Sequence, residues 1–263
     1  MCREPQYACY AAGQAYQPTL GTDCSARSTC GPSDVLSDAQ REYVTGTILP
    51  AALQFFTDTL AVVPVVGRLA LNHPIPESSC VSPAEGICNE FICCDSNFPP
   101  ADKANGVPNS DFHVYVTARP TSGNIIAWAL TCQADQYGRP TAGQINFGPG
   151  LLSTDATQLA QQLSTAIHEL THALGFSASA FSTWRSPGSD VVWSGTLNGV
   201  AVNALITPNI ATAASAQFGC LSGSWTPMPA GGLLEDYGGS GTVGSHWKKR
   251  VFMNEYSETV RVG

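Results

Sequence analysis

Basic side chains are scarce in this 263-residue sequence, and charged residues of both signs make up only 12% of it. Twelve lysines and arginines stand against twenty aspartates and glutamates, which gives a formal net charge of −8. Nucleic acids and acidic membranes attract basic surfaces, so this balance argues against a nucleic-acid partner. The short basic run at 248–250 is too small to reverse it.

Long apolar runs are also missing. The longest candidate, residues 60–66, is interrupted by Pro64 and ended by Gly67, well short of the roughly 18 residues that a membrane-spanning helix needs. We expect no transmembrane segment, and any surface attachment would be indirect. Because 43% of the residues are hydrophobic, the chain can still bury a substantial core, and we expect one compact domain with two lobes.

Cysteine, in contrast, is abundant, with ten in the chain and eight of them among the first 94 residues. This density is typical of a disulfide framework, and disulfides persist in secreted and cell-surface proteins. The first five residues lack the apolar core of a secretion signal, so we expect an extracellular or cell-surface protein whose signal lies outside this sequence. The alternative for Cys88, Cys93 and Cys94 is a second zinc site formed by reduced thiols.

The most informative motif is His168-Glu169-Leu170-Thr171-His172, an H-E-x-x-H sequence. On a helix, the two histidines share one face, where their ring nitrogens can bind zinc at about 2.0–2.1 Å. Glu169 is then available to take a proton from a water that the metal acidifies. An accidental match is expected on the order of 0.005 times in a chain of this composition. The motif therefore predicts metal-assisted hydrolysis of peptide bonds.

The surrounding sequence predicts that this motif is helical. Apolar residues recur at three- and four-residue steps through 154–176, as in an amphipathic helix. Thr154 or Asp155 suits the start of the helix, and Gly175 suits its end.

A catalytic zinc site needs a third protein ligand. Gly175 comes three residues after His172, where the metzincin peptidases turn the chain toward a distant histidine. No histidine follows until His246, which becomes the leading candidate, although an ordinary surface histidine would look the same in sequence. His73 and His113, in a strand-like stretch, are expected to be structural.

Several separate segments resemble leishmanolysin, a surface metallopeptidase family within the metzincins. Residues 166–177 resemble the active-site helix of the family. Residues 238–247, Gly-Gly-Ser-Gly-Thr-Val-Gly-Ser-His-Trp, resemble its third-ligand segment, which a long insertion separates from the helix. The stretches that resemble the preceding strands are 111–117, 127–133 and 143–146. The resemblance covers most of residues 33–256.

The resemblance implies that His168, His172 and His246 hold one catalytic Zn²⁺ and that Glu169 is the general base. It also implies a disulfide from Cys132 to Cys93 or Cys94.

Two positions depart from the family pattern. Metzincins place a methionine in a turn beneath the zinc, and Ser257 stands at the corresponding position, with Met253 four residues earlier. The family partner of Cys220 would lie in a C-terminal region that this sequence does not include. We therefore expect Cys220 to be free, intermolecular or paired with an N-terminal cysteine, and residues 258–263 to be a divergent or truncated end.

The predicted fold class is α+β, a metzincin-like two-lobed zinc peptidase with a twisted sheet and the active-site helix in the upper lobe. We expect a single peptidase domain over 1–263, made of a cysteine-rich segment at 1–32, an upper lobe at 33–175 and a lower lobe at 176–263.

More local expectations follow from periodicity and from glycine and proline. They are a helical stretch at 33–59 with a kink at Pro50, strands starting at 67–71 and lying near 112–117, 125–131 and 143–147, an irregular connection at 80–109, a loop-rich segment after 175 with flexible turns at Gly231-Gly232 and Gly238-Gly239, and a short helix from Pro208 to Phe218. An edge strand near 124–130 is expected to hold an extended peptide by backbone pairing, with Trp128 equally suited to the core and to substrate contact.

The leading functional hypothesis is a secreted or surface zinc endopeptidase that acts on proteins or peptides. The alternative, motivated by Ser257 and the early chain end, is an adhesion or binding module that keeps the fold and is catalytically impaired.

Overall fold

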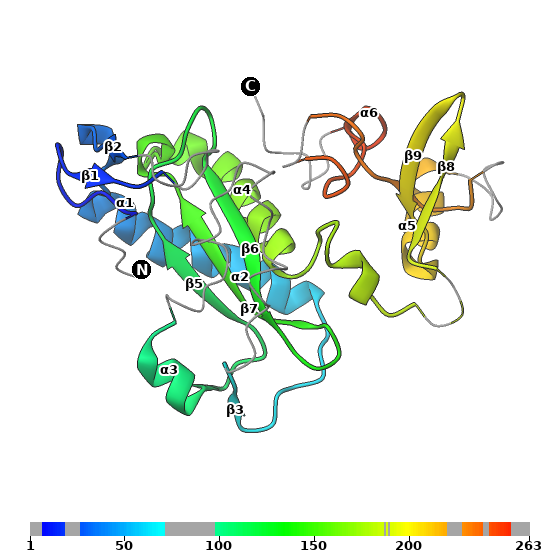
Figure 1. Ribbon diagram of the computed structural model, residues 1–263, viewed down its shortest axis with the longest axis horizontal. Helices are drawn as coiled ribbons and strands as arrows, with labels where there is room; N and C mark the ends of the chain where they lie inside the picture. Colours follow the sequence, from blue (N-terminus) through cyan, green and yellow to red (C-terminus); the bar gives the residue numbers. More distant parts are fainter. Residues whose placement is uncertain are drawn as a thin grey trace. The chain divides into compact units, whose positions relative to one another are not determined.

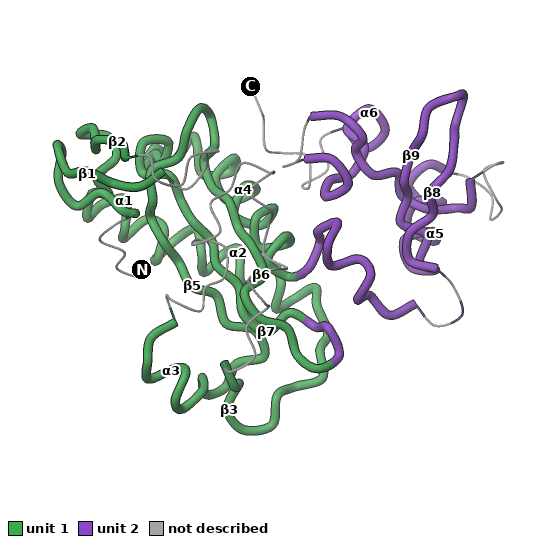
Figure 2. The backbone as a smooth tube through the Cα atoms, in the orientation of Figure 1, with its two compact units in different colours: residues 1–136, 140–174, 259–263 green, residues 137–139, 175–258 purple. Residues whose placement is uncertain are grey.

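The computed structural model (Figure 1) describes residues 7–18, 27–71, 98–186, 188, 190–219, 228–238 and 242–253. The chain divides into two compact units (Figure 2). Unit 1 comprises Met1–Gln136, Pro140–Leu174 and Thr259–Gly263, and unit 2 comprises Tyr137–Arg139 and Gly175–Glu258. The assignment of two lobes within one peptidase domain stays a prediction.

Unit 1 holds a mixed set of helices and strands. In chain order they are β1 (Ala15–Tyr16), β2 (Ser28–Thr29), η1 (Pro32–Asp34), α1 (Asp38–Tyr43), η2 (Val44–Ile48), α2 (Leu49–Thr59), β3 (Arg68–Leu69), α3 (Pro100–Asn105), β4 (Val107–Pro108), β5 (His113–Thr117), β6 (Ala127–Ala134), β7 (Pro140–Phe147), η7 (Pro149–Leu151), η8 (Ala156–Gln158) and α4 (Leu159–Ala173). The predicted α+β class is confirmed.

The main sheet of unit 1 has the strand order β5-β7-β6, with β5 parallel and β6 antiparallel to β7. All three strands lie where the alternating pattern predicted them. Side chains alternate between the two faces. On β7, Ile145 and Phe147 belong to the core shared with α4, whereas Ala142 belongs to a second core with Tyr115 and Cys132.

Two helices, α2 and α4, cover one face of this sheet (Figure 1). Ile48 and Ala52 from the first helical segment meet Ala166 and Leu170 from α4 in one buried cluster. Each apolar side chain buried in this way contributes about 1.5–3 kcal/mol relative to exposure, so the sheet and the two helices form one stable layered core.

The expected helix at 33–59 is present, with a distortion near its proline. Ser37 caps α1 by accepting a hydrogen bond from the Gln40 amide. Pro50 has no N–H and its ring crowds the preceding turn. The turn just before it is π-helical, and the Leu49 amide donates to the Val44 carbonyl.

The irregular connection expected at 80–109 is wrong for its last part. Residues 72–97 lie outside the described part, but Pro100–Asn105 form α3. Pro100 occupies the first turn, where a missing N–H has no cost, and Gly106 ends the helix with a φ of 68°. The chain then pairs β4 with β3 in antiparallel fashion.

Unit 2 also has regular structure, which corrects the expectation of a loop-rich segment. Its elements are η9 (Phe181–Thr183), β8 (Val192–Leu197), β9 (Val200–Leu205), α5 (Pro208–Phe218), β10 (Gly232–Leu233) and α6 (Lys249–Phe252). The strand order is β10-β9-β8. Asn198 and Gly199 join β8 to β9 with φ values of 50° and 80°, the Asn-Gly hairpin signal that periodicity alone overlooks. The predicted helix Pro208–Phe218 is confirmed.

The core of unit 2 is rich in aromatic residues. Phe181 and Leu205 are fully buried, and Phe176, Trp184 and Trp247 pack against them. Gly231 and Gly232 are not flexible turns: a Cβ on Gly231 would clash with the Leu205 carbonyl, and one on Gly232 would lie 2.5 Å from the Trp247 ring. Glycine is required there because β10 passes so close to its neighbours.

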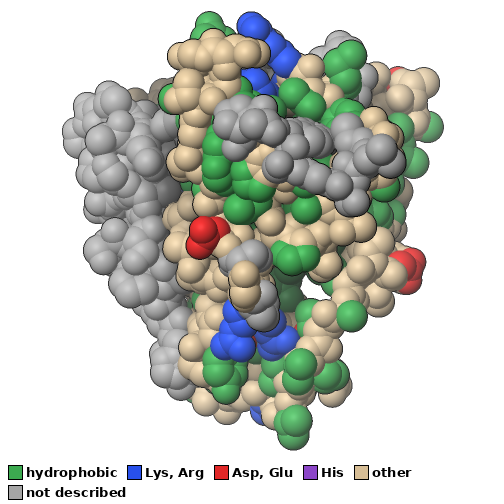
Figure 3. Space-filling view, turned by 90° about the vertical axis from the view of Figure 1, so that its right-hand side faces the viewer, with side chains coloured by type: hydrophobic (Ala, Val, Ile, Leu, Met, Phe, Trp, Pro, Cys, Tyr) green, Lys and Arg blue, Asp and Glu red, His purple; other side chains and the backbone are tan. Residues whose placement is uncertain are grey.

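No helix in the described part of the chain is long and apolar enough to cross a membrane. Charged side chains are sparse on the face shown in Figure 3, in keeping with the composition.

Candidate metal centre

The helix α4 brings two of the predicted ligands together. His168 and His172 are four residues apart on it, and their Nε2 atoms are 3.0 Å apart. The start of the helical segment is capped by Asp155, whose carboxylate accepts from the Thr157 amide. At the other end, Gly175 has a φ of 102°, as its predicted role requires.

Contacts with the sheet fix the C-terminal half of α4. The Thr131 hydroxyl, on β6, donates to the Ala173 carbonyl at 2.9 Å, with the His172 carbonyl at 3.4 Å. Gly143, on β7, lets the helix come close, since a Cβ there would lie 2.9 Å from the Ala173 Cβ. Helix and sheet therefore meet directly beneath His172.

Glu169 is the buried carboxyl of this helix, with 5% of its surface exposed. Burial raises its pKa to about 8, and a hydrogen bond with the Ala129 backbone opposes the rise. Ala129 lies on β6, at the edge of the described sheet. Glu169 is thus next to the two histidines in sequence and in contact with an edge strand.

The donor set of α4 fits zinc. Two zinc–nitrogen bonds of about 2.0–2.1 Å at a near-tetrahedral angle separate the nitrogens by roughly 3–3.5 Å, and the observed separation is 3.0 Å. Neutral imidazole nitrogens are among the preferred ligands of this ion. The pair supplies two ligands, and further ones must come from elsewhere.

His246 lies in unit 2, in the loop between β10 and α6. Its Nδ1 is 3.1 Å from the Thr242 carbonyl and 3.2 Å from the Ser245 hydroxyl. A carbonyl only accepts, so Nδ1 carries the proton in this contact and Nε2 keeps a lone pair for a metal. Burial lowers the pKa of His246, which favours the neutral ring, while Thr242 and the charge of Glu235 oppose the shift.

The other residues singled out by sequence have simpler surroundings. His113 lies on β5, half-buried, with its ring 4.7 Å from that of Tyr115 in an edge-on contact. Burial lowers its pKa and the charge of Asp102 opposes this. Met253 is 70% exposed. The expectations about His73, Cys88, Ser257 and Cys220 concern residues outside the described ranges.

Disulfides are present in the N-terminal unit. Cys9 is bonded to Cys30, and Cys132 is also disulfide-bonded. Its predicted partners, Cys93 and Cys94, are not among the described residues, so that pairing stays a prediction.

Three residues that support the histidines were missed by sequence reasoning: Thr131, Gly143 and Glu235. A threonine and a glycine in a strand give no local signal of what lies above them, because their partners are about 30 to 40 positions away. Glu235 gives no signal either, since its contacts depend on how a loop closes.

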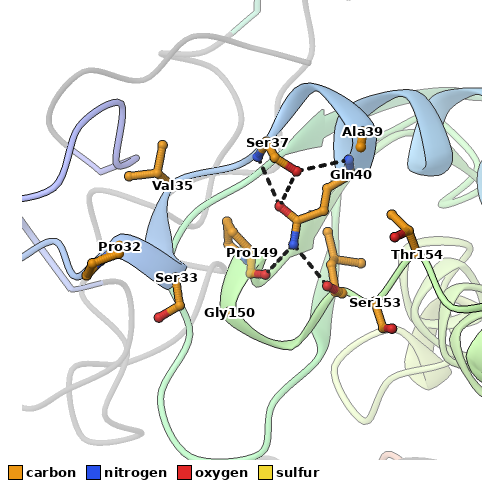
Figure 4. Close-up of a pocket in the computed structure, with 11 residues that line it drawn as sticks. Pro32, Ser33, Val35, Ser37, Ala39, Gln40, Pro149, Gly150, Ser153 and Thr154 are labelled. Carbon is orange, nitrogen blue, oxygen red and sulfur yellow. Dashed lines mark hydrogen bonds between the residues drawn. The ribbon is translucent and has the colours of Figure 1, made fainter.

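A pocket of about 470 Å³ lies elsewhere in unit 1, between η1, α1 and the segment after β7 (Figure 4). Gln40 donates to the carbonyls of Pro149 and Leu152 across its floor. None of the predicted ligands, nor Glu169, lines it. The polar groups of Gln40 are used to join two segments of the fold, which is a structural role.

A helix that carries H-E-x-x-H and packs on the face of a mixed sheet is the arrangement of the zincin class of metallopeptidases. Within that class, this chain belongs to the leishmanolysin family, whose sequence model matches residues 2–262. The predicted family resemblance is confirmed.

Individual relatives agree. Leishmanolysin of Leishmania tropica is 30% identical over 265 residues, covering 99% of this chain and 35% of the relative. Leishmanolysin of Leishmania donovani is 32% identical, covering 95% of this chain and 38% of the relative. A leishmanolysin-like peptidase of Drosophila pseudoobscura pseudoobscura is 28% identical, covering 84% and 41%. The chain therefore spans a little over a third of the length of the curated relatives it matches.

Proposed function

We propose that this chain is the catalytic part of a zinc-dependent endopeptidase, in which His168, His172 and His246 hold one zinc ion and Glu169 is the general base. The observation that carries the proposal is the pair of Nε2 atoms 3.0 Å apart on α4, with a buried carboxyl at the adjacent position. Membership of the leishmanolysin family supports it.

The third ligand is assigned by sequence order and by chemistry. His246 is the histidine that follows α4, and its protonated Nδ1 leaves Nε2 as the donor atom. A hydrogen bond from Nδ1 to a carbonyl is the usual way in which proteins orient a metal-binding imidazole.

Bound zinc would supply a Lewis acid that polarises the substrate carbonyl and acidifies a water. Glu169 would take the proton from that water on a carboxylate oxygen and pass it to the leaving amine. Burial keeps bulk water from competing for this carboxylate, and the Ala129 backbone holds it in place.

The substrate class we propose is an extended peptide that pairs with the edge strand β6. Glu169 contacts Ala129 on that strand, so a peptide lying along β6 would bring its carbonyl groups near the base. Trp128 lies at a neighbouring position, where its ring is 5.6 Å from the Arg119 guanidinium on the opposite face of the sheet from α4. This favours a structural role for Trp128.

The Cys9–Cys30 disulfide supports the further proposal of an extracellular or cell-surface location, because such bonds persist in oxidising compartments.

The first test is cleavage of a mixed peptide library by the purified chain, with zinc content measured before and after chelation and zinc return. We expect Glu169→Gln to retain zinc and to lose cleavage by about 100- to 10,000-fold, the usual contribution of a general base. The matched control is Glu42→Gln on the exposed surface of α1, which should cleave like the parent.

Equal cleavage by Glu169→Gln and the parent would contradict the assignment of the base. Stoichiometric zinc without cleavage by the parent would instead support a binding or adhesion module that keeps the fold.

A further inference from the structure

The loop that carries His246 is closed by a single carboxylate. We infer that Glu235 is a positioning residue for the metal centre: it fastens both ends of the loop 235–249 and so sets the orientation of the His246 ring before a metal binds. This inference rests on the proposed role of His246 as a ligand.

The backbone forms the frame of the loop. Leu234 and Trp247 make an antiparallel bridge, and the Lys248 amide donates to the Leu233 carbonyl at 2.8 Å. Inside this bridge, the Glu235 amide donates to the His246 carbonyl at 2.8 Å, and the Gly244 amide donates to the Glu235 carbonyl, also at 2.8 Å. Glu235 is therefore the residue directly across from His246.

The Glu235 side chain then ties the two strands of the loop together. Its Oε1 accepts from the amides of Asp236 at 3.0 Å and Tyr237 at 3.2 Å. Its Oε2 accepts from the Lys249 amide at 2.9 Å. Three donors converge on two oxygens, an arrangement that an ionised carboxylate satisfies and a carboxamide does not.

The same loop orients His246 from the other side. The Ser245 amide donates to the Thr242 carbonyl, which also receives Nδ1 of His246, and Gly244 turns the chain with a φ of 75°. The position of the Thr242 carbonyl thus depends on the closure of the loop. Glu235 acts on the imidazole through this closure and does not touch a reacting atom.

Apolar packing anchors the loop on unit 2 but does not close it. The Trp247 ring lies 4.9 Å from that of Phe176 and 5.3 Å from that of Phe252. These contacts hold the returning strand, whereas its opposite strand at 235–237 is held by hydrogen bonds. Removing the carboxylate should therefore loosen the loop while leaving the core of unit 2 packed.

The decisive variant is Glu235→Gln. Whichever way the amide is turned, its NH₂ faces backbone donors: the Lys249 amide in one orientation, and those of Asp236 and Tyr237 in the other. We expect the zinc dissociation constant, measured by competition with a chelating dye, to weaken by about 10- to 100-fold, as for other partners of metal-binding histidines.

A second substitution tests the contact itself. Lys249→Pro removes the donor that opposes Oε2, and the backbone accepts proline there because Lys249 is the first residue of α6 and Lys248 is extended, with ψ of 108°. In the double variant Glu235→Gln, Lys249→Pro, the amide oxygen can serve Asp236 and Tyr237 with no donor facing the NH₂. We expect this variant to recover most of the lost affinity.

The control within the same loop is Asp236→Asn, which breaks the ion pair with Lys248 but leaves every contact of Glu235 in place. It should bind zinc nearly as tightly as the parent. If Glu235→Gln does not fold, Glu235→Asp replaces it: the shorter side chain keeps the charge but cannot reach both ends of the loop, and the same loss is expected.

His246→Ala separates the two possible failures. If it weakens zinc binding while the Glu235 variants bind like the parent, or if Lys249→Pro restores nothing, Glu235 has only a local structural role and the inference is wrong. If His246→Ala binds zinc like the parent, the ligand assignment in the proposed function is wrong.

Discussion

The two units hold their metal-binding candidates in different ways. In unit 1, His168 and His172 lie on a 15-residue helix whose inner face is packed against a sheet. In unit 2, His246 lies on a loop that is shaped by backbone hydrogen bonds and one carboxylate. Close packing resists displacement in every direction, whereas a hydrogen-bonded loop depends on a few directional contacts.

This difference predicts which substitutions matter. Changes beneath α4 should lower the stability of unit 1 as well as disturb the metal centre. Changes at the carboxylate of the His246 loop should alter metal affinity with less effect on overall stability.

The largest effect on stability in unit 1 is expected from Gly143→Ala. Its Cβ would lie 2.8 Å from the Phe112 ring and 3.1 Å from the Leu130 carbonyl, in addition to the Ala173 contact. The helix has to move away, at a cost of about 1–3 kcal/mol. Denaturant unfolding measures the loss.

The matched control is Gly46→Ala in the helical segment before α2, where a Cβ would meet nothing within 4 Å. It should raise the free energy of unfolding by about 0.4–1 kcal/mol, because alanine restricts the unfolded chain. If Gly143→Ala were as stable as Gly46→Ala, the close packing of α4 on β7 would be refuted.

A smaller effect is expected from Thr131→Val, which keeps the shape of the side chain and removes the hydroxyl that donates to the Ala173 carbonyl. The free energy of unfolding should fall by about 0.5–1.5 kcal/mol. Thr131→Ser keeps the donor and should recover most of this loss, which the same unfolding assay can follow. Equal losses in the two variants would assign the effect to packing.

The smallest effect is a pH dependence that comes from His113. Burial lowers its pKa in the folded protein, so above the unfolded pKa of about 6.5 both states are neutral and the residue adds no pH dependence. As the pH falls below that value, the unfolded chain takes up the proton first and stability is lost. The free energy of unfolding should therefore drop more between pH 7 and pH 5 for the parent than for His113→Gln. Parallel curves would show that His113 titrates normally in the fold.

The sequence predicted the elements whose side chains repeat with a fixed period. The helix around His168, the strands near 112–117 and 143–147, and the helix from Pro208 to Phe218 all have such a repeat or a clear terminal signal. Their burial depends on neighbours within one or two turns, which the sequence displays directly.

The features that sequence missed depend on contacts between distant residues. Gly231 and Gly232 looked like a flexible turn because glycine pairs often are. They form a strand since the rings and carbonyls beside them leave no space for a side chain. In the same way, the roles of Thr131 and Glu235 arise only when β6 meets α4 and when the loop 235–249 closes.

The central claim is that three histidines, two from the helix of unit 1 and one from the loop of unit 2, share one zinc ion. X-ray absorption spectroscopy of the zinc-loaded parent and of His246→Ala tests it most directly. We predict three imidazole ligands in the parent and two in the variant. An unchanged number of imidazoles on removal of His246, or no zinc bound to the parent, would contradict the account.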